Sequence, residues 1–275
     1  MWKRLFPDCC IESRGESVHV RTLEPAHYEE ISRMSETWMP AELYEATLFS
    51  AHGYADFLRA SLAIPPSRFT SHFIGMYRNV DSLIGFAEWR LIDDILFLNN
   101  FYVSAPFRGR GIGSHVIRQA SIHAAKEGFS SVQLDAFDTN ESAIRLYERN
   151  GFVRQHAYYW YASAPLHQWK DVEAGETSLN YMVQDWPQAV ASLEVYGYGF
   201  FRVSFDRQEE RIVLMKENFF RMRLKAAMNK DVLALLARLA PHRRVLVSDG
   251  GEEPPHSGME QLAVAFRMVK PLSTR

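Results

Sequence analysis

A glycine-rich run, residues 103–113, constrains the fold of this chain more than any other feature. An apolar stretch typical of a buried strand precedes it, residues 95–102, and residues 114–126 carry apolar side chains at helical spacing after it. Its glycines, which therefore fall where a strand turns into a helix, are Gly109, Gly111 and Gly113. Free N–H groups and the helix dipole favour an anion at such a point, and glycine lets the backbone approach it closely. The run predicts a phosphate-binding loop.

The spacing within this run excludes two common phosphate loops. A nucleotide-triphosphate loop requires a lysine after its last glycine, and Ser114 follows Gly113 here. The dinucleotide pattern Gly-x-Gly-x-x-Gly is also absent. The run instead reads Arg108-x-x-Gly111-x-Gly113, and Arg108 and Arg110 add positive charge. On the glycines alone, a strand–turn–helix connection without a ligand is the alternative.

Composition narrows the class of protein. With 275 residues, the chain exceeds one typical domain, and 47% apolar residues can build a core. A net charge of −2 gives no basic field for nucleic acid or a membrane surface, and no apolar run is long enough to span a membrane. The N-terminus lacks the apolar segment of a secretory signal. Cys9 and Cys10 are the only cysteines; they make a poor disulfide and no zinc pattern. We expect a cytoplasmic protein without a metal site.

Strand and helix patterns alternate in the first part of the chain, after an expected irregular lead-in, residues 1–16. The pattern predicts strands over 18–23, 72–77, 83–91, 95–102, 131–137 and 152–161, and helices after Pro25, within 35–69, and over 114–126 and 141–149. Short connections join them. This order predicts an α/β or α+β sheet with helices packed on it.

The second part follows a linker that we place at residues 163–176, which separates expected domains 1–162 and 177–275. Beyond it, the pattern predicts a helix over 179–193, strands over 198–205 and 211–216, helices over 219–228 and 231–239, and strands over 244–247 and 261–269. We therefore expect a smaller C-terminal α+β domain.

A second motif follows about 30 residues after the glycine run: Asn140-x-x-Ala143-x-x-Leu146-Tyr147-x-x-x-Gly151-Phe152. Together with Arg108-x-x-Gly111-x-Gly113, it resembles the GNAT superfamily of N-acyltransferases in a two-domain form. The resemblance covers residues 17–161. It implies a central mixed, largely antiparallel sheet with helices on both faces. The C-terminal domain is either a degenerate GNAT-like unit or an unrelated α+β domain.

The resemblance also implies a co-substrate, acetyl-coenzyme A or a related acyl-CoA, and no metal. The loop would hold its diphosphate through Arg108, Gly109, Arg110, Gly111, Ile112, Gly113 and Ser114. The strand before the loop would separate from its neighbour at a bulge, so that amides around Phe101, Tyr102 and Val103 pair with pantetheine and one polarises the thioester. The alternative for this strand is complete pairing within the sheet.

Three residues of the second motif receive roles by the same resemblance. Asn140 would bind the pantetheine arm, and the small side chain of Ala143 would let the cofactor lie close. Tyr147 would act as general acid and protonate the departing thiolate. From the residues alone, Asn140 is also a typical helix N-cap and Tyr147 a typical core aromatic.

The implied reaction is direct attack of a primary amine, from a small molecule or a peptide, on the thioester. Such an amine is mostly protonated near neutral pH, so a base must take its proton. Phe97 occupies the strand position where several relatives carry glutamate. Glu88 on the preceding strand is the best candidate, and its alternative is a solvated strand carboxylate. His72 and His156 are weaker candidates.

The missing strand glutamate keeps a second function open: a catalytically inactive acyl-CoA-binding sensor or interaction module. Hydrolysis or acyl transfer to oxygen is less well supported, because no Gly-x-Ser-x-Gly elbow is present. Neither nucleic acid nor membrane is expected as a partner, and a homodimer is compatible with the sequence. The sequence does not identify the acceptor.

Overall fold

A computed structural model describes residues 1–13, 15–63, 71–79, 81–169, 181–205, 208–215 and 218–273. The chain forms two compact units: unit 1 contains Met1–Trp38, Phe57–His156 and Phe266–Arg275, and unit 2 contains Met39–Asp56 and Ala157–Ala265. The units are discontinuous because strand β7 (Val153–Ser163) begins in unit 1 and ends in unit 2, whereas β13 (Met259–Pro271) does the reverse. This grouping differs from the contiguous domains that we expected, because the last ten residues belong to unit 1 and Met39–Asp56 belongs to unit 2.

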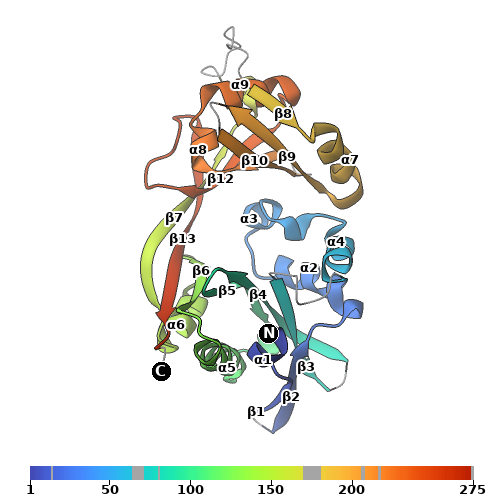
Figure 1. The fold of residues 1–275 in the computed structure, drawn as a ribbon, viewed down its shortest axis with the longest axis vertical. Helices are drawn as coiled ribbons and strands as arrows, with labels where there is room; N and C mark the ends of the chain where they lie inside the picture. Colours follow the sequence, from blue (N-terminus) through green and yellow to red (C-terminus); the bar gives the residue numbers. More distant parts are fainter. Residues whose placement is uncertain are drawn as a thin grey trace. The chain divides into compact units, whose positions relative to one another are not determined.

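The sheet of unit 1 has the strand order β1 (Cys9–Ser13), β2 (Glu16–Thr22), β3 (Ser71–Arg78), β4 (Ser82–Ile92), β5 (Ile95–Val103), β6 (Ser131–Phe137), followed by β13 (Figure 1). Neighbouring strands from β1 to β5 are antiparallel, and β5 and β6 are parallel. The parallel pair is connected through a helix, as parallel strands require. This crossover carries the glycine-rich run.

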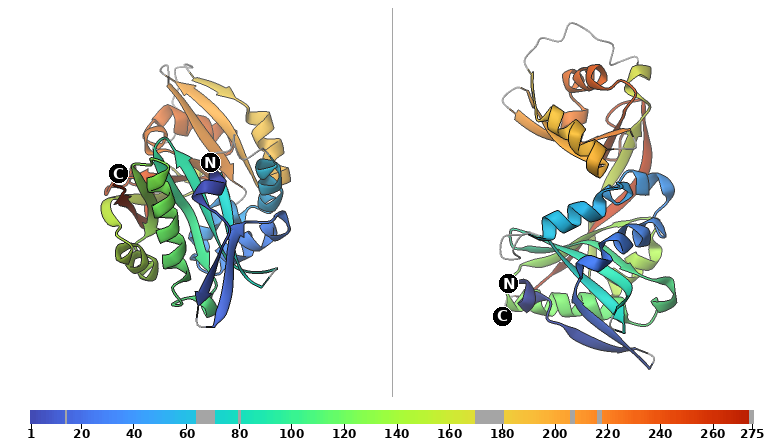
Figure 2. Two further views of the ribbon diagram at one scale, coloured as in Figure 1. Left: turned by 60° about the horizontal axis from the view of Figure 1, so that its bottom comes forward. Right: turned by 90° about the vertical axis from the view of Figure 1, so that its right-hand side faces the viewer.

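Helices flank both faces of this sheet, as Figure 2 shows for α2 (Tyr28–Glu36) and α5 (Ile112–Lys126). Helix α5 buries Val116, Ile117, Ala120 and Ala124 in a core shared with the sheet. The other helical segments described for this part are α1 (Trp2–Leu5), η1 (Pro25–His27), η4 (Ala105–Phe107) and α6 (Glu141–Arg149), together with α4 (Tyr54–Leu62), whose first residues belong to unit 2. The GNAT-like mixed sheet with helices on both faces is therefore confirmed.

The expected irregular lead-in, residues 1–16, is wrong. Helix α1 buries Trp2 and Leu5 in the core of unit 1, and β1 pairs with β2 in an antiparallel hairpin. The turn lies between Ser13 and Glu16 and contains Gly15 with a φ of +80°. A glycine in the left-handed region is typical of a hairpin connection, and this glycine was present in the sequence.

The strand order continues with β7, β12 (Arg244–Gly250), β11 (Phe219–Met222), β10 (Gln208–Met215), β9 (Tyr198–Phe205) and β8 (Tyr181–Gln184), in one hydrogen-bonded series with the strands above. These neighbours are antiparallel except the parallel pair β11–β12. The helical segments described for unit 2 are α3 (Ala41–Glu45), η2 (Leu48–Ser50), η5 (Leu166–Gln168), α7 (Trp186–Tyr196), α8 (Leu224–Ala227) and α9 (Lys230–Leu239).

Two predicted helices of this unit are wrong in part. Residues 219–228 form β11 and then α8, because Phe219–Met222 pairs with strands on both sides. A short, fully buried apolar run cannot be told from a helix by its spacing. The helix predicted over 179–193 begins only at Trp186, after β8, with Pro187 in its first turn. Residues 170–176 of the predicted linker lie outside the described residues, whereas Leu166 is buried in the core of unit 2.

The remaining predicted strands and helices are confirmed, with bounds that differ by a few residues. Among the described residues, none of the helices combines the length and the apolar character that a membrane crossing requires.

Candidate functional site

The glycine-rich loop connects β5 to α5 and lies exposed on unit 1. Gly109 and Gly111 have φ values of +69° and +81°, in the left-handed region that favours glycine. Gly111 is the N-cap of α5, and no side chain of the described residues caps this helix start. The first intrahelical bond runs from His115 N–H to the Gly111 carbonyl. The N–H groups of the first turn therefore point out of the helix, as an anion site requires.

The side chains of the loop are mostly engaged within the protein. Arg108 donates through Nε to the Val103 carbonyl at 2.7 Å, with its guanidinium over the Tyr102 ring. Arg110 pairs with Glu16 at 2.8 Å. The charge that we expected Arg110 to add is thus offset by a carboxylate, and the main chain is the part of the loop best placed for a ligand.

Strand β5 separates from β6 before its own end. Their parallel register ends at Leu98↔Leu134, although β5 continues for five residues. A bulge at the same level shifts the register with β4, so that Glu88 pairs with Asn100 and Trp89 with Leu98. The bulge expected from the resemblance is therefore present. Asn99 is the extra residue of this bulge.

The register assigns a direction to the amides after the bulge. Ser104 donates its N–H to the Ile84 carbonyl of β4 at 2.8 Å. Because successive residues of a strand turn their N–H groups to opposite edges, Tyr102 also faces β4, whereas Phe101 and Val103 face the side that β6 has left. Of the strand amides that we expected to bind pantetheine, two point to this side and that of Tyr102 does not.

Gly113 lies where β5, α5 and α6 meet. A Cβ atom at this position would lie 3.2 Å from both Leu146 Cδ2 and Phe101 Cε1, so glycine permits the close approach. Ser114 strengthens the junction, since its hydroxyl donates to Asn150 Oδ1 at 2.9 Å. The two sequence motifs, which are about 30 residues apart in the chain, are thus adjacent in the structure.

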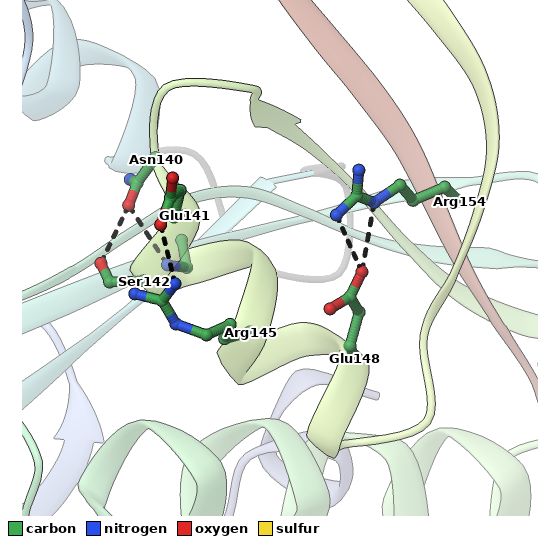
Figure 3. Close-up of polar contacts among 7 residues, drawn as sticks. Asn140, Glu141, Ser142, Arg145, Glu148 and Arg154 are labelled. Atoms are coloured by element: carbon green, nitrogen blue, oxygen red, sulfur yellow. Dashed lines mark hydrogen bonds and ion pairs between the residues drawn. The ribbon is translucent and has the colours of Figure 1, made fainter.

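Asn140 directly precedes helix α6, and its Oδ1 accepts from Ala143 N–H at 3.2 Å and from the Ser142 hydroxyl at 3.1 Å (Figure 3). Asn140 is therefore an N-cap. On the exposed side of α6, Figure 3 shows the ion pairs Glu141–Arg145 and Glu148–Arg154, at 2.8 and 3.0 Å. The opposite side carries Ala143, Ile144 and Tyr147 into the core.

Tyr147 is buried, with its ring 5.9 Å from that of Phe152. Burial raises the pKa of its phenol well above the ordinary value of 10. Within the described part of the chain, no hydrogen bond to its hydroxyl is formed. The phenol therefore stays protonated near neutral pH and has a proton to donate.

Glu88 is buried rather than solvated, with 3% of its surface exposed, so the alternative that we gave for it is wrong. Its Oε1 accepts from Arg90 Nε at 2.7 Å, and its Oε2 accepts from the side-chain amides of Asn99, at 2.7 Å, and Asn100. A carboxylate offers about four lone-pair directions, so the three donors leave room for one further donor. The bulge is what brings both asparagines to this carboxylate.

The two histidines lie in other surroundings. His72 is buried against Trp2 and Phe6, at ring-centroid distances of 4.9 and 5.8 Å, and burial lowers its pKa to about 4. His156 is exposed on β7. Neither is part of the glycine loop or of the Glu88 cluster.

A cavity of about 330 Å³ in unit 1 was not predicted from the sequence. It lies between the α1–β1 segment, β2, β3 and α5, and Phe6, Cys9, His115 and His123 line it. It contains none of the predicted site residues, and it depends on the N-terminal segment that we expected to be irregular. In the ranges that the structure describes, no group of three or more His, Cys, Asp and Glu side chains is arranged as a metal site.

Residues 28–152 match the Acetyltransferase (GNAT) family. An uncharacterized N-acetyltransferase of Bacillus subtilis is 27% identical over 135 residues, which are 48% of this chain and 82% of that protein. The spermine/spermidine N(1)-acetyltransferase of Bacillus subtilis is 30% identical over 88 residues, which are 29% of this chain and 57% of that protein. N-alpha-acetyltransferase 30 of Xenopus laevis is 42% identical over 60 residues, 22% of each chain.

Two solved structures resemble nearly the whole chain in fold. A tandem GNAT protein from the clavulanic acid biosynthesis pathway has a TM-score of 0.64 at 12% identity, with 92% of this chain and 98% of that chain covered. A GCN5-related N-acetyltransferase from Sphaerobacter thermophilus has a TM-score of 0.60 at 13% identity, with 92% and 95% covered. The GNAT-like fold thus extends beyond the matched domain. The matched part of the chain, residues 28–152, is a domain of the GNAT acetyltransferase family.

Proposed function

We propose that this protein transfers an acetyl or related acyl group from acyl-coenzyme A to a primary amine of a small molecule or peptide. The observation that carries the proposal is the exposed, uncapped start of α5 at Gly111, beside the part of β5 that β6 has left. The first offers N–H groups to a diphosphate, and the second offers a free strand edge to an extended, amide-containing arm. Coenzyme A contains both of these groups, a diphosphate and an extended arm with amide groups.

In this proposal the diphosphate binds the main chain of residues 109–114 with Arg108 at its rim. The pantetheine arm pairs with Phe101 and Val103 like an added strand. Ala143 and Asn140 border this path, and the Nδ2 of Asn140 is the group that would reach the arm, since its Oδ1 already caps α6. The amide of Phe101 or Val103 polarises the thioester carbonyl.

The chemical step is a direct displacement. The amine nitrogen attacks the thioester carbonyl carbon, the C–N bond forms and the C–S bond breaks. The Tyr147 phenol gives its proton to the departing thiolate, and Glu88 takes a proton from the amine, directly or through water. The products are the N-acylated amine and coenzyme A with a free thiol. The surrounding water takes the proton from Glu88 and returns one to Tyr147, so that both groups regain their starting protonation states.

The relatives named above differ in their acceptors, spermine or spermidine in one and an alpha-amine in another, so they support the amine class without selecting within it. A second candidate is an acyl-CoA-binding protein without turnover. The three hydrogen bonds that Glu88 already accepts favour it, because they leave this carboxylate only one lone-pair direction for a further proton-bearing group.

Calorimetric titration with coenzyme A, together with thiol release from acetyl-CoA in a panel of polyamines, amino acids and short peptides, tests both candidates. Binding and thiol release with one class of amine support the transferase. Binding without release from any amine supports the sensor. No binding at millimolar coenzyme A contradicts both.

A further inference from the structure

The N-terminal hairpin, β1–β2, contacts the glycine-rich loop of unit 1. The Ser13 hydroxyl, at the end of β1, donates to the Arg110 carbonyl at 2.7 Å, across 97 residues of sequence. Ser13 is 5% exposed, so water competes little for this bond. The sequence motifs assign no functional role to any residue of this hairpin.

The hydrogen bond from Ser13 fixes the orientation of one particular peptide unit. The Arg110 carbonyl and the Gly111 N–H belong to the same peptide group, which is trans. In a trans peptide, these two groups point in opposite directions. Because the carbonyl is held toward β1, the Gly111 N–H is directed away from the hairpin. Gly111 is also the N-cap of α5, so its N–H lies at the helix start where an anion binds.

A second set of contacts holds Arg110 through its side chain. Glu16, at the start of β2, pairs through Oε2 with Arg110 at 2.8 Å and through Oε1 with Arg78 at 2.9 Å. Both guanidinium groups lie over the Phe107 ring, with Arg110 5.0 Å and Arg78 5.9 Å from its centroid. The Arg110 side chain is thereby drawn toward the hairpin, on the same side as its carbonyl.

We infer that Ser13 is a positioning residue for the cofactor, which orients the Gly111 amide toward the diphosphate of coenzyme A. The inference rests on the proposed function, since it assumes that this ligand binds the loop. It assigns Ser13 no contact with the ligand and no part in the acyl transfer itself. The hairpin would set the affinity of the loop and leave the chemistry to other residues.

The test is the affinity for coenzyme A, measured by calorimetry, in three variants. Ser13→Ala is expected to weaken binding about fivefold, the usual effect of one hydrogen bond. Ser13→Thr keeps a hydroxyl on a strand position and is expected to retain the affinity. Ser17→Ala is the matched control, because the exposed Ser17 hydroxyl on the same hairpin donates to Glu12 rather than to the loop.

Comparing two ligands, one with the diphosphate and one without it, distinguishes a positioning role of Ser13 from a general loss of stability. The Ser13→Ala loss is expected with coenzyme A and not with S-acetylpantetheine, which lacks the diphosphate, compared by kcat/KM or by competition. Melting temperatures establish that the variants are folded. Should Ser13→Ala not fold, Ser13→Cys gives the same comparison, since a thiol is a weak donor.

Each outcome separates this inference from the proposed function. If the unmodified protein does not bind coenzyme A, the proposed function fails and the inference fails with it. If it binds and Ser13→Ala binds equally well, only the positioning role is overturned. An equal loss with coenzyme A and S-acetylpantetheine would also overturn it.

Discussion

The two units differ most at the crossover that follows their parallel strands. In unit 1, β5 pairs in parallel with β6, and a glycine-rich loop leads to α5, whose start is uncapped by side chains of the described residues. In unit 2, β11 pairs in parallel with β12, and Arg223 leads directly into α8, without glycine. There, Leu224 donates its N–H to Asp249 Oδ1 at 2.7 Å.

This difference shows that two crossovers with the same strand-and-helix order can differ in their suitability for a phosphate. A carboxylate of the protein occupies the helix start in unit 2, and its negative charge would repel a phosphate that came near. Helix α8 is also only four residues long, against fifteen in α5, so it has little dipole to offer an anion. The same strand-and-helix topology can thus support a diphosphate site or exclude one, and a few residues of the crossover decide which.

Removing the proposed proton donor of unit 1 would have the largest effect. Tyr147→Phe is expected to lower kcat about 100-fold, because the thiolate would leave without a general acid, and to spare the affinity for coenzyme A. Steady-state kinetics with calorimetry measure both. Tyr198→Phe, which removes the hydroxyl of a buried tyrosine in unit 2, is the matched control and should keep kcat. Equal losses in the two variants would contradict the assignment of catalysis to unit 1.

Forcing the loop out of its conformation comes next. Gly111→Val places a β-branched residue at a φ of +81°, and the strain, about 2 kcal/mol, corresponds to roughly 30-fold weaker binding of coenzyme A if the loop relaxes to avoid it. Gly128→Val is the control, since Gly128 has a φ of +85° after the other end of α5. Both variants should lose similar stability, and only Gly111→Val should lose affinity. The account would be wrong if Gly128→Val weakened binding as much.

A smaller effect is expected at the buried carboxylate. Glu88→Gln keeps the size of the side chain and most of its hydrogen bonds but cannot accept the amine proton, so kcat should fall about tenfold if water takes over part of the role. The KM for acetyl-CoA should not change. Asn99→Asp, which puts a second carboxylate beside Glu88, tests whether the cluster depends on this one amide. An unchanged kcat in Glu88→Gln would remove Glu88 from the mechanism.

Acid should act on unit 1 through His72. Its pKa in the folded protein, about 4, lies below its ordinary value of 6.5, so between these values the unfolded chain binds more protons. Stability from this group is complete above pH 6.5 and is lost as the pH falls toward 4. The free energy of unfolding should drop by about 0.8 kcal/mol between pH 7.5 and 6. Denaturant titrations measure it, and His72→Phe should lose this dependence. The same pH slope in His72→Phe would contradict the assignment.

The backbone geometry at the proposed cofactor site could be predicted from the sequence because it depends on local rules. Gly109 and Gly111 adopt left-handed conformations in a strand-to-helix connection, and Asn140 caps a helix, so each can be read from a short stretch of chain. The side chains of Glu88 and Ser13 depend on strand pairing over longer distances. The surroundings of Glu88 follow from a bulge in β5, and those of Ser13 from a hairpin that reaches a loop 97 residues away.

The errors in the fold have a related cause. The strand Phe219–Met222 is too short for its apolar spacing to exclude a helix, and its pairing with β10 and β12 decides its conformation. The hairpin at Gly15 was predictable from its turn, and the buried face of α1 became clear only with the sheet against which Trp2 and Leu5 pack. Tertiary contacts therefore determine the conformation of these segments, which the local sequence pattern does not.

The stoichiometry of coenzyme A binding tests the central claim most directly, namely that the crossover of unit 1 binds the diphosphate and that of unit 2 does not. Calorimetry on the full chain should give one molecule of coenzyme A per chain. Asp249→Asn, which removes the charge at the start of α8, should leave this site and its affinity unchanged, whereas Gly111→Val should weaken it. Two equivalent sites, or a single site that Asp249→Asn alters and Gly111→Val does not, would contradict the account.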